Sequence, residues 1–235
     1  MVEERRMYKC IFFDLDHTLW DYETNSKETL IELHEQFQLI DHGILDVEKF
    51  SATFRVTNEK LWDLYDRGLI PSDYIRKERF RQILREFGTF DDDLAASLSY
   101  EYLENCPKRG NLMPYAIETL EYLSERYNLT VITNGFEEIQ NTKLTSSNLH
   151  HYFDHVITSQ KAKAKKPARE IFEFALQSNA IGAHEAMMVG DNLVTDIGGA
   201  RNASIDVTFF NPFSVQHTEQ VKHEINSLQE LCSLL

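Results

Sequence analysis

The sequence predicts a doubly wound α/β fold with a mostly parallel sheet, interrupted by an inserted all-helical domain. Short apolar runs alternate with amphipathic helical stretches in the second half of the chain, which is typical of βαβ units. One further apolar run stands near the start of the chain, before a long region with helical spacing. Because strands joined through helices pair in parallel, all of these runs are expected to share one sheet.

Each predicted strand is an apolar run that ends at a polar cluster. The first covers residues 8–13 (YKCIFF) and ends at the cluster DLDHT. The later strands are predicted at residues 129–133 (LTVIT), 153–159 (FDHVITS), 186–190 (AMMVG) and 206–210 (DVTFF). Helices are predicted over residues 115–126, between the second and third strands, over residues 167–178 and from Leu193 onward.

The inserted domain is predicted from hydrophobic spacing between the first strand and the others. Leu30, Leu33 and Phe37, and later Leu61 and Leu64, recur at intervals of three and four with charged residues between them. No segment of this region has the pattern of a strand. We therefore assign residues 1–20 and 107–235 to an α/β core domain and residues 21–106 to a helical cap domain.

Length and charge limit the classes of partner. A chain of 235 residues is long enough for one full domain and a smaller insertion. Its 24 Lys and Arg against 38 Asp and Glu give a net charge of −14, which repels a nucleic-acid backbone. We therefore expect no nucleic-acid polymer as a partner, and a small phosphorylated metabolite remains compatible with a local cation or metal.

Other features of the composition indicate the compartment. The three cysteines, Cys10, Cys106 and Cys232, are far apart and show neither a disulfide framework nor a metal-binding spacing. The charged N-terminus lacks the apolar stretch of a secretory signal, and no apolar run approaches membrane-spanning length. We expect a cytoplasmic monomer or weak homodimer that does not associate with a membrane.

Polar residues follow four of the predicted strands, where parallel sheets bind their ligands. The four clusters are Asp14-Leu15-Asp16-His17-Thr18, Thr133-Asn134-Gly135, Lys165-Lys166-Pro167, and Gly190-Asp191-Asn192 with Thr195-Asp196. Two carboxylate-bearing loops would bind a hard cation such as Mg²⁺. A hydroxyl and a lysine would hold phosphate oxygens.

The segments DLDHTL, ITNG, Lys-Pro and GDNLVTD resemble the four motifs of the haloacid dehalogenase superfamily, in the same order and each at the end of a strand. A lone DxD would be weak evidence, whereas four motifs in register are specific. The helical region lies where that superfamily carries its inserted cap, so the resemblance covers nearly the whole chain. It implies a Rossmann-like core and a magnesium-dependent phosphatase that works through an aspartyl-phosphate intermediate.

The resemblance also implies a role for each residue of the motifs. Asp14 resembles the nucleophile, and Asp16 resembles the acid that protonates the leaving group and then the base that activates water. A phosphate dianion repels a carboxylate nucleophile, so positive charge must offset that repulsion. Lys166 resembles the cation that does so, with Lys165 as the alternative if the register of the loop shifts.

The remaining motif residues resemble ligands and positioning groups. The carboxylates of Asp14 and Asp191 and the backbone carbonyl of Asp16 resemble the magnesium ligands. Asp196, with Asn192, resembles the group that holds a metal-bound water. The phosphate-binding residues implied are Thr133, Asn134, Gly135 and Thr18. Taken alone, Thr133 could be an ordinary hydroxyl at a strand end and Asp196 could face solvent on its helix; within the motifs, the functional interpretation is favoured for both.

Asp16 narrows the class of reaction. Dehalogenases, phosphonatases and P-type ATPases of the superfamily lack an acid at this position, whereas a sugar alkoxide leaving group requires one. In sugar phosphomutases a Thr and a His follow shortly after the first motif, and WDYETNSKETL does not match that pattern. A phosphatase is therefore favoured over a phosphomutase. A catalytically silent scaffold that acts as a binding module is the alternative from another class.

The predicted cap offers a clue to the substrate. The segments NEKLWDLYDRGLI and KERF resemble the cap of the pyrimidine 5′-nucleotidases of the superfamily, which implies nucleoside monophosphates such as UMP, dUMP and dTMP. The candidate contacts to the leaving group are Trp20, Asn58, Trp62 and Arg79, although each is equally compatible with helix packing. The alternative substrates are sugar or small-metabolite phosphates, as for N-acylneuraminate-9-phosphatase or phosphoglycolate phosphatase.

Overall fold

The computed structural model describes residues 8–235, and the chain divides into two compact units. Of the described residues, 8–21 and 110–235 form the core unit, and Tyr22–Arg109 form the cap unit. Residues 1–7, which carry much of the expectation that no secretory signal is present, lie outside the described residues. Within residues 8–235, no helix is both long and apolar enough to cross a membrane.

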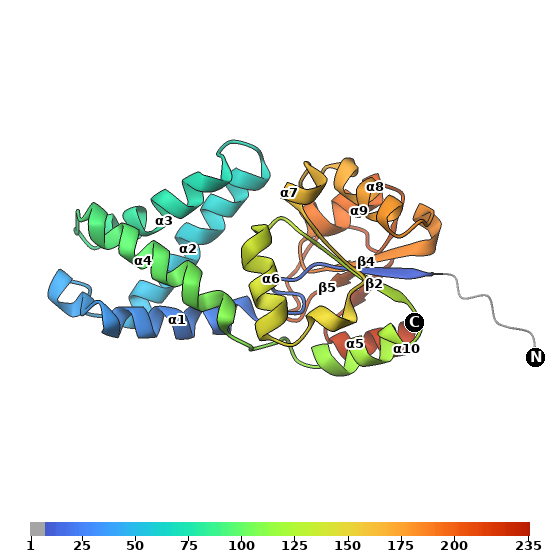
Figure 1. Cartoon of the computed structure of the whole chain (residues 1–235), viewed down its shortest axis with the longest axis horizontal. Coiled ribbons are helices and arrows are strands. Elements are labelled where there is room, and N and C mark those ends of the chain that lie inside the picture. Colours follow the sequence, from blue (N-terminus) through green and yellow to red (C-terminus); the bar gives the residue numbers. More distant parts are fainter. Residues whose placement is uncertain (1–7) are drawn as a thin grey trace, which may run out of the picture. The chain divides into compact units, whose positions relative to one another are not determined.

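The core unit is built on one six-stranded sheet with the order β3-β2-β1-β4-β5-β6 (Figure 1). Every neighbouring pair of strands is parallel. The strands are β1 (Cys10–Phe13), β2 (Asn128–Thr133), β3 (His155–Thr158), β4 (Ala186–Gly190), β5 (Asp206–Phe210) and β6 (His223–Ile225). The predicted α/β class is confirmed. The strand order reverses beside β1, and ligands of such sheets bind outside the carboxyl ends of the strands at this point.

Helices cover both faces of this sheet, which explains why the strands are almost continuously apolar. In Figure 1, α8 and α9 lie on one side of the strands, and α5 and α10 lie on the other. Cys10, Phe12 and Met188 pack against Phe172 of α8 and Ala200 of α9 in a buried cluster. The helices of the core unit are α5 (Ala116–Ser124), α6 (Glu137–Ser146), α7 (Ser159–Ala162), α8 (Arg169–Ser178), α9 (Gly199–Asn202) and α10 (Leu231–Leu234).

The structure differs from the sequence-based elements at three places. The edge strand β6 was not predicted, because its three residues include a histidine and a glutamate and show no apolar run. Strand β3 ends at Thr158, whose side chain accepts a hydrogen bond from Lys161 N and so starts the short helix α7. The helix predicted from Leu193 begins as a π-helical segment, Leu193–Gly198, and becomes α-helical only in α9.

The cap unit consists of helices, and no strand occurs in its described residues, 22–109. The helices are α1 (Tyr22–Gln36), α2 (Val47–Asp66), α3 (Ser72–Glu86) and α4 (Asp92–Asn105). Asp46 caps α2 by accepting from Glu48 N and Lys49 N, which satisfies two of its free amide groups. The rings of Phe54, Phe80 and Tyr102 form a buried aromatic cluster with centroids 4.8–5.8 Å apart.

Gly199, at the start of α9, allows this helix to pack closely against the segment that precedes α8. A Cβ on Gly199 would lie 2.6 Å from Cε2 of Phe172 and 2.9 Å from Cα of Pro167. The second of these atoms is backbone, so an added methyl group would displace the chain beside Lys166. We expect Gly199→Ala to lower the free energy of unfolding by about 1–3 kcal/mol, measured by urea denaturation.

Gly110→Ala is the matched control. A Cβ at this position meets only Ser146 O at 3.7 Å, an ordinary van der Waals distance. We expect its unfolding free energy to stay within about 0.5 kcal/mol of the wild type. A Gly199→Ala variant as stable as the control would contradict the close packing described for α9.

Candidate active site

The polar clusters lie at the carboxyl edge of the sheet, where strand order carries them. Asp14 directly follows β1, and its amide donates to Val189 O of β4 at 3.0 Å, so the ladder holds its backbone. Asp191 directly follows β4, and Thr133 is the last residue of β2. Lys166 lies in the connection between α7 and α8. Four segments distant in sequence thus deliver their side chains to one place.

A buried ammonium group joins two of the carboxylates. Lys166 Nζ lies 2.5 Å from Oδ1 of Asp14 and 2.6 Å from Oδ1 of Asp196. Lys166 is 2% exposed and Asp196 is 1% exposed, so solvent screens these ion pairs little. The second oxygen of Asp196 accepts from Asn192 N at 3.0 Å. Lys166, and not Lys165, therefore supplies the ammonium group that contacts Asp14.

One lysine faces several carboxyl groups in this cluster. Burial raises the pKa of Asp14 well above its usual range; Lys166 opposes this shift, whereas Asp196 and Asp191 add to it. Burial also raises the pKa of Asp191 to about 7, and Asp196 adds to it. Burial alone would lower the pKa of Lys166, but the charges of Asp14 and Asp196 outweigh it and raise that pKa. Lys166 therefore stays protonated beside Asp14, whose carboxyl group resists ionisation.

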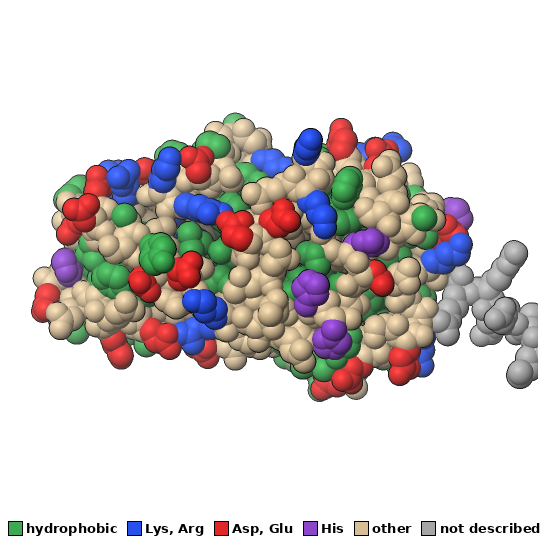
Figure 2. Space-filling view, in the orientation of Figure 1, with side chains coloured by type: hydrophobic (Ala, Val, Ile, Leu, Met, Phe, Trp, Pro, Cys, Tyr) green, Lys and Arg blue, Asp and Glu red, His purple; other side chains and the backbone are tan. Residues whose placement is uncertain are grey.

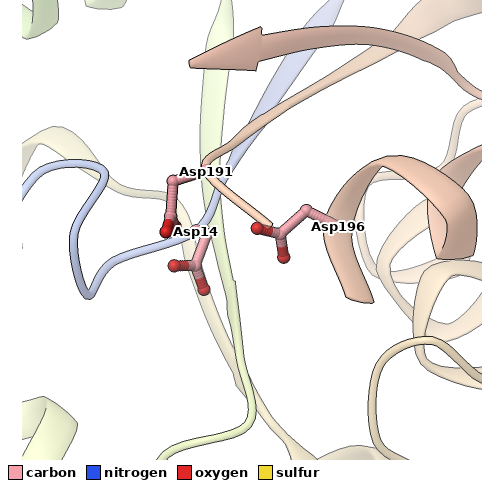
Figure 3. A group of neighbouring side chains, drawn as sticks. All are labelled: Asp14, Asp191 and Asp196. Atoms are coloured by element: carbon pink, nitrogen blue, oxygen red, sulfur yellow. The ribbon is translucent and has the colours of Figure 1, made fainter. Parts of the chain in front are cut away.

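These carboxylates form a site that fits a hard divalent cation. Asp14, Asp191 and Asp196 each offer one oxygen, and the three oxygens lie within 4.8 Å of one another. Figure 3 shows the carboxyl groups of Asp14 and Asp191 beside each other, with that of Asp196 next to them. Oxygen donors with an excess of negative charge suit Mg²⁺. Since Lys166 and Asn192 already engage Asp196, its geometry fits an orienting role rather than a direct ligand.

The second cluster holds the active-site lysine in place. The side chain of Asn134 donates from Nδ2 to Lys166 O at 2.9 Å and accepts from Lys166 N at 2.8 Å. Both amide atoms of Asn134 are therefore engaged with the Lys166 backbone, so this residue positions the lysine. The buried hydroxyl of Thr133 accepts from Gly135 N at 3.1 Å, which shapes the turn after β2.

Two further residues from the sequence analysis support the carboxylates. Thr18 Oγ1 donates to Asp191 Oδ1 at 3.1 Å, so it holds a carboxylate that the sequence analysis assigned to the metal. Asn192 accepts from Val194 N and Thr195 N, which caps the π-helical segment. Both residues act on the position of Asp191 or Asp196 in this structure.

Asp16 has partners that the sequence analysis did not identify. Lys143 Nζ lies 2.5 Å from Asp16 Oδ1, and Gln140 Nε2 donates to Asp16 Oδ2 at 3.1 Å. Both partners come from α6, the helix after the second motif. The spacing of Gln140 and Lys143, three residues apart on one helix, was the available signal, since such residues share a face.

The residues proposed to contact the leaving group fall into different environments. Trp20 belongs to the core unit and is fully buried, with Lys143 Nζ 4.2 Å from its ring centroid. It therefore packs beneath a lysine and does not present its ring for stacking. In the cap unit, Trp62 packs edge-on against Tyr65, with ring centroids 5.5 Å apart.

The structure brings the other two cap residues together. Arg79 Nη1 donates to Asn58 Oδ1 at 3.0 Å, and Asn58 Nδ2 donates to the hydroxyl of Tyr22 at 3.0 Å. Arg79 also lies over the aromatic cluster of the cap unit, with its guanidinium carbon 4.5 Å from the Tyr102 ring centroid. Asn58 and Arg79 therefore act as one buried polar group.

A parallel sheet with a carboxylate after β1, a buried lysine and further carboxylates after β4 gives a Rossmann-like fold whose acidic site suits phosphoryl chemistry. Residues 8–204 match the model of the haloacid dehalogenase-like hydrolase family, so the chain belongs to this family of enzymes. Within the family it is a phosphatase, in agreement with the relatives that match it over almost its whole length.

Similar proteins include two bacterial nucleotidases and one solved structure. Pyrimidine 5′-nucleotidase PynA of Streptococcus pneumoniae is 30% identical over 97% of this chain and 95% of its own length. Pyrimidine 5′-nucleotidase YjjG of Escherichia coli is 27% identical over 96% of each chain. The crystal structure of the putative HAD-hydrolase YfnB from Bacillus subtilis bound to magnesium has a TM-score of 0.87 and 26% identity, over 97% of this chain and 99% of that one.

The raised pKa of Asp191 leads to a prediction about magnesium. Because the folded, metal-free protein has a pKa of about 7 at this carboxyl, it binds more protons than the unfolded chain, whose Asp pKa is about 3.9. This group therefore lowers stability as the pH rises from about 4 to about 7, with no further change above. Mg²⁺ needs the ionised carboxylates, so its stabilising effect should be larger at about pH 8 than at about pH 6.

The measurement is the shift in Tm on adding Mg²⁺ to the metal-free protein at the two pH values. A free Mg²⁺ concentration of about 100 times Kd corresponds to about 2.7 kcal/mol of added stability. Asp191→Asn should reduce this shift at both pH values, because it removes a charged oxygen ligand. An equal shift at both pH values in the wild type, or a full shift in Asp191→Asn, would contradict the assignment.

Proposed function

We propose that the chain is a magnesium-dependent phosphomonoester hydrolase that acts on pyrimidine nucleoside 5′-monophosphates through an aspartyl phosphate on Asp14. The observation that carries the reaction type is the buried Asp14–Lys166 pair, joined at 2.5 Å. A carboxylate approaches a phosphate dianion only where positive charge offsets their repulsion, and a buried ammonium group supplies such charge without reorganisation. Magnesium held by Asp14, Asp191 and the backbone carbonyl of Asp16 would add to that charge.

In the first half-reaction, an oxygen of Asp14 attacks phosphorus and the bond from phosphorus to the leaving oxygen breaks. Asp16 gives its proton to that oxygen, so the nucleoside leaves as an alcohol. Lys166 holds Asp14 in line and interacts with the phosphoryl oxygens. Thr133 and the turn that it shapes line the same edge of the sheet and would bind the phosphoryl group.

In the second half-reaction, Asp16 is a carboxylate and accepts a proton from a water molecule. That water attacks phosphorus of the aspartyl phosphate, which releases phosphate and restores the Asp14 carboxylate. The two steps together consume one water and one phosphate monoester and yield one alcohol and one phosphate. Asp16 regains its proton in the same cycle.

Asp16 also separates a phosphatase from the other reactions of this fold. A halide leaves without a proton, whereas a nucleoside alkoxide is a poor leaving group that requires one. A silent scaffold that only binds would not need the second carboxylate together with a buried lysine. Asp16 lies within reach of donors from α6, so its side chain is held and not merely solvated.

The proposal of a pyrimidine nucleotide as substrate has two supports. The pyrimidine 5′-nucleotidases of S. pneumoniae and E. coli are relatives over almost the whole chain. The cap segments at residues 58–70 and 77–80 resemble the same group. A sugar or small-metabolite phosphate is the alternative, because the phosphoryl chemistry itself does not depend on the leaving group.

Arg79 provides a physical reason for placing selectivity in the cap unit. It is 3% exposed, and within residues 8–235 its Nε and Nη2 atoms have no hydrogen-bond partner. A buried donor without a partner costs about 1–3 kcal/mol, so such donors are expected to serve a bound molecule. The carbonyl oxygens of a pyrimidine ring are acceptors for a guanidinium group, which presents two donors side by side. We therefore assign base recognition to Arg79 and Asn58.

The nucleophile is tested by Asp14→Asn. An amide does not attack phosphorus, so steady-state phosphate release from UMP and from p-nitrophenyl phosphate should fall by at least about 10³-fold while Tm is retained. Asp63→Asn, an exposed carboxylate paired with Arg67 on α2, is the control and should keep full activity. Activity of Asp14→Asn within about tenfold of the wild type would refute the covalent mechanism.

Substrate selectivity is tested by Asn58→Ala and Arg79→Met. Because Arg79→Met removes donors for the base, and Asn58→Ala removes the amide that holds Arg79, kcat/KM for UMP or dTMP should fall about 10- to 100-fold. The value for p-nitrophenyl phosphate should change little, and Lys77→Met, an exposed residue of the same helix, should change neither. Equal losses for both substrates with a lower Tm, or a wild type that prefers sugar phosphates to every pyrimidine nucleotide, would refute the assignment.

A further inference from the structure

Two long polar side chains of α6 are buried beside the candidate acid. Gln140 and Lys143 lie three residues apart on this helix and therefore share a face. Gln140 is 2% exposed and Lys143 is 4% exposed. A lysine is almost never buried to this extent unless it is paired, so its partner identifies what the burial serves.

The two side chains hold opposite oxygens of one carboxylate. Lys143 Nζ lies 2.5 Å from Oδ1 of Asp16, and Gln140 Nε2 donates to Oδ2 at 3.1 Å. A donor on each oxygen fixes both the position and the plane of the carboxyl group. Both of these donors come from α6.

Trp20 fixes the lysine from the other side. Its ring is fully buried, and Lys143 Nζ lies 4.2 Å from the ring centroid. The amide of Trp20 donates to Leu15 O at 2.9 Å, and its carbonyl accepts from His17 N at 3.0 Å. The ring is thus tied to the same loop that carries Asp16, and a desolvated ammonium group above an indole ring is held by cation–π attraction.

The glutamine is held at some cost. A Cβ at position 135 would lie 1.8 Å from Gln140 Nε2, so only a glycine leaves room for the amide. Within residues 8–235, Oε1 of Gln140 has no hydrogen-bond partner although it is buried. Leaving this acceptor unpaired is unfavourable. The hydrogen bond from Gln140 Nε2 to Asp16 therefore accounts for the buried position of this glutamine.

We propose that Lys143 and Gln140 are positioning residues for Asp16, and that proton transfer to and from the leaving group requires them. This inference rests on the phosphatase function proposed above and assigns a role to residues outside the four motifs. Lys143 and Gln140 hold both oxygens of Asp16, so the carboxyl group keeps one orientation while it exchanges a proton with the leaving oxygen and with water. Because the plane of the Asp16 carboxyl group is fixed, its oxygen lone pairs that do not bind Lys143 or Gln140 keep one direction. Proton transfer to and from the substrate depends on such alignment.

The test is the rate of phosphoryl transfer to the enzyme in single-turnover kinetics, with UMP and with p-nitrophenyl phosphate. A nucleoside needs the proton and p-nitrophenolate needs it far less, so a defect in Asp16 should appear mainly with UMP. Asp16→Asn should lower the UMP rate by about 10²-fold or more, the typical contribution of general acid catalysis. Lys143→Met should show the same selectivity as Asp16→Asn. It should lower the rate with UMP at least about tenfold more than the rate with p-nitrophenyl phosphate.

Two further variants separate position from stability. Lys143→Arg keeps the charge and is able to lie over an indole ring, so it should restore part of the UMP rate. Lys161→Met, at an exposed lysine of α7, is the matched control and should match the wild type for both substrates. Gln140→Leu, which keeps the volume and removes the donor, should show the UMP-selective loss in a milder form.

A double-mutant cycle shows whether the effect passes through Asp16. When Asp16 is already Asn, adding Lys143→Met should change the UMP rate by less than about threefold, because the group that it positions has gone. Multiplicative losses in the double variant, or equal losses of Lys143→Met for both substrates, would overturn the inference. A wild type that releases no phosphate from either compound would refute the proposed phosphatase instead, so the two failures are distinguishable.

Discussion

One interaction organises the site: a single buried ammonium group, that of Lys166, faces the carboxylates of Asp14 and Asp196 at 2.5 and 2.6 Å. Burying three charged groups is unfavourable unless their geometry is good and their remaining donors and acceptors are satisfied. The chain satisfies them from three directions: Asn134 clamps the lysine backbone, Asn192 N donates to Asp196, and Gly199 lets α9 approach the segment before α8. The residues around the lysine are therefore explained by the need to hold one buried positive charge between two carboxylates.

The same constraint separates two carboxylates that are two positions apart in the chain. Asp14 is buried with other acidic groups, and burial raises its pKa well above the usual range. Asp16 is held instead by Lys143 and Gln140, and its side chain is partly exposed. The proposed mechanism gives the two carboxyl groups different tasks, with Lys166 beside the nucleophile and the donors of α6 beside the group that transfers protons. The proposed mechanism places both halves of a phosphoryl transfer in the core unit. On the face shown in Figure 2, acidic and basic side chains intermingle.

The sequence was sufficient for the elements whose signal is local. The apolar runs of β1, β2, β4 and β5 predicted the strands that flank the site, because a sheet covered on both faces leaves a strong pattern. The sequence was insufficient where tertiary contacts determine the structure or the role of a residue. Strand β6 has only three residues at an edge, and the choice between Lys165 and Lys166 depends on the Asn134 clamp. Lys143 resembles any lysine of an amphipathic helix until the fold brings it to Asp16, and Trp20 resembles a stacking platform until it is found beneath that lysine.

Phosphoryl chemistry in the core unit does not determine which leaving group the enzyme accepts. A site that recognises only a phosphoryl group and a cation binds every phosphate monoester alike, so selectivity has to come from other residues. In the cap unit, the buried guanidinium group of Arg79 pairs with Asn58 and aromatic rings, and no carboxylate contacts it among the ion pairs of the described residues. Within a helical domain such a cation is expensive, and packing alone would be served better by an apolar side chain. This unfavourable burial is explained if the unpaired N–H groups of Arg79 donate to a bound substrate. Folding alone does not explain the position of Arg79, so this residue is informative about function.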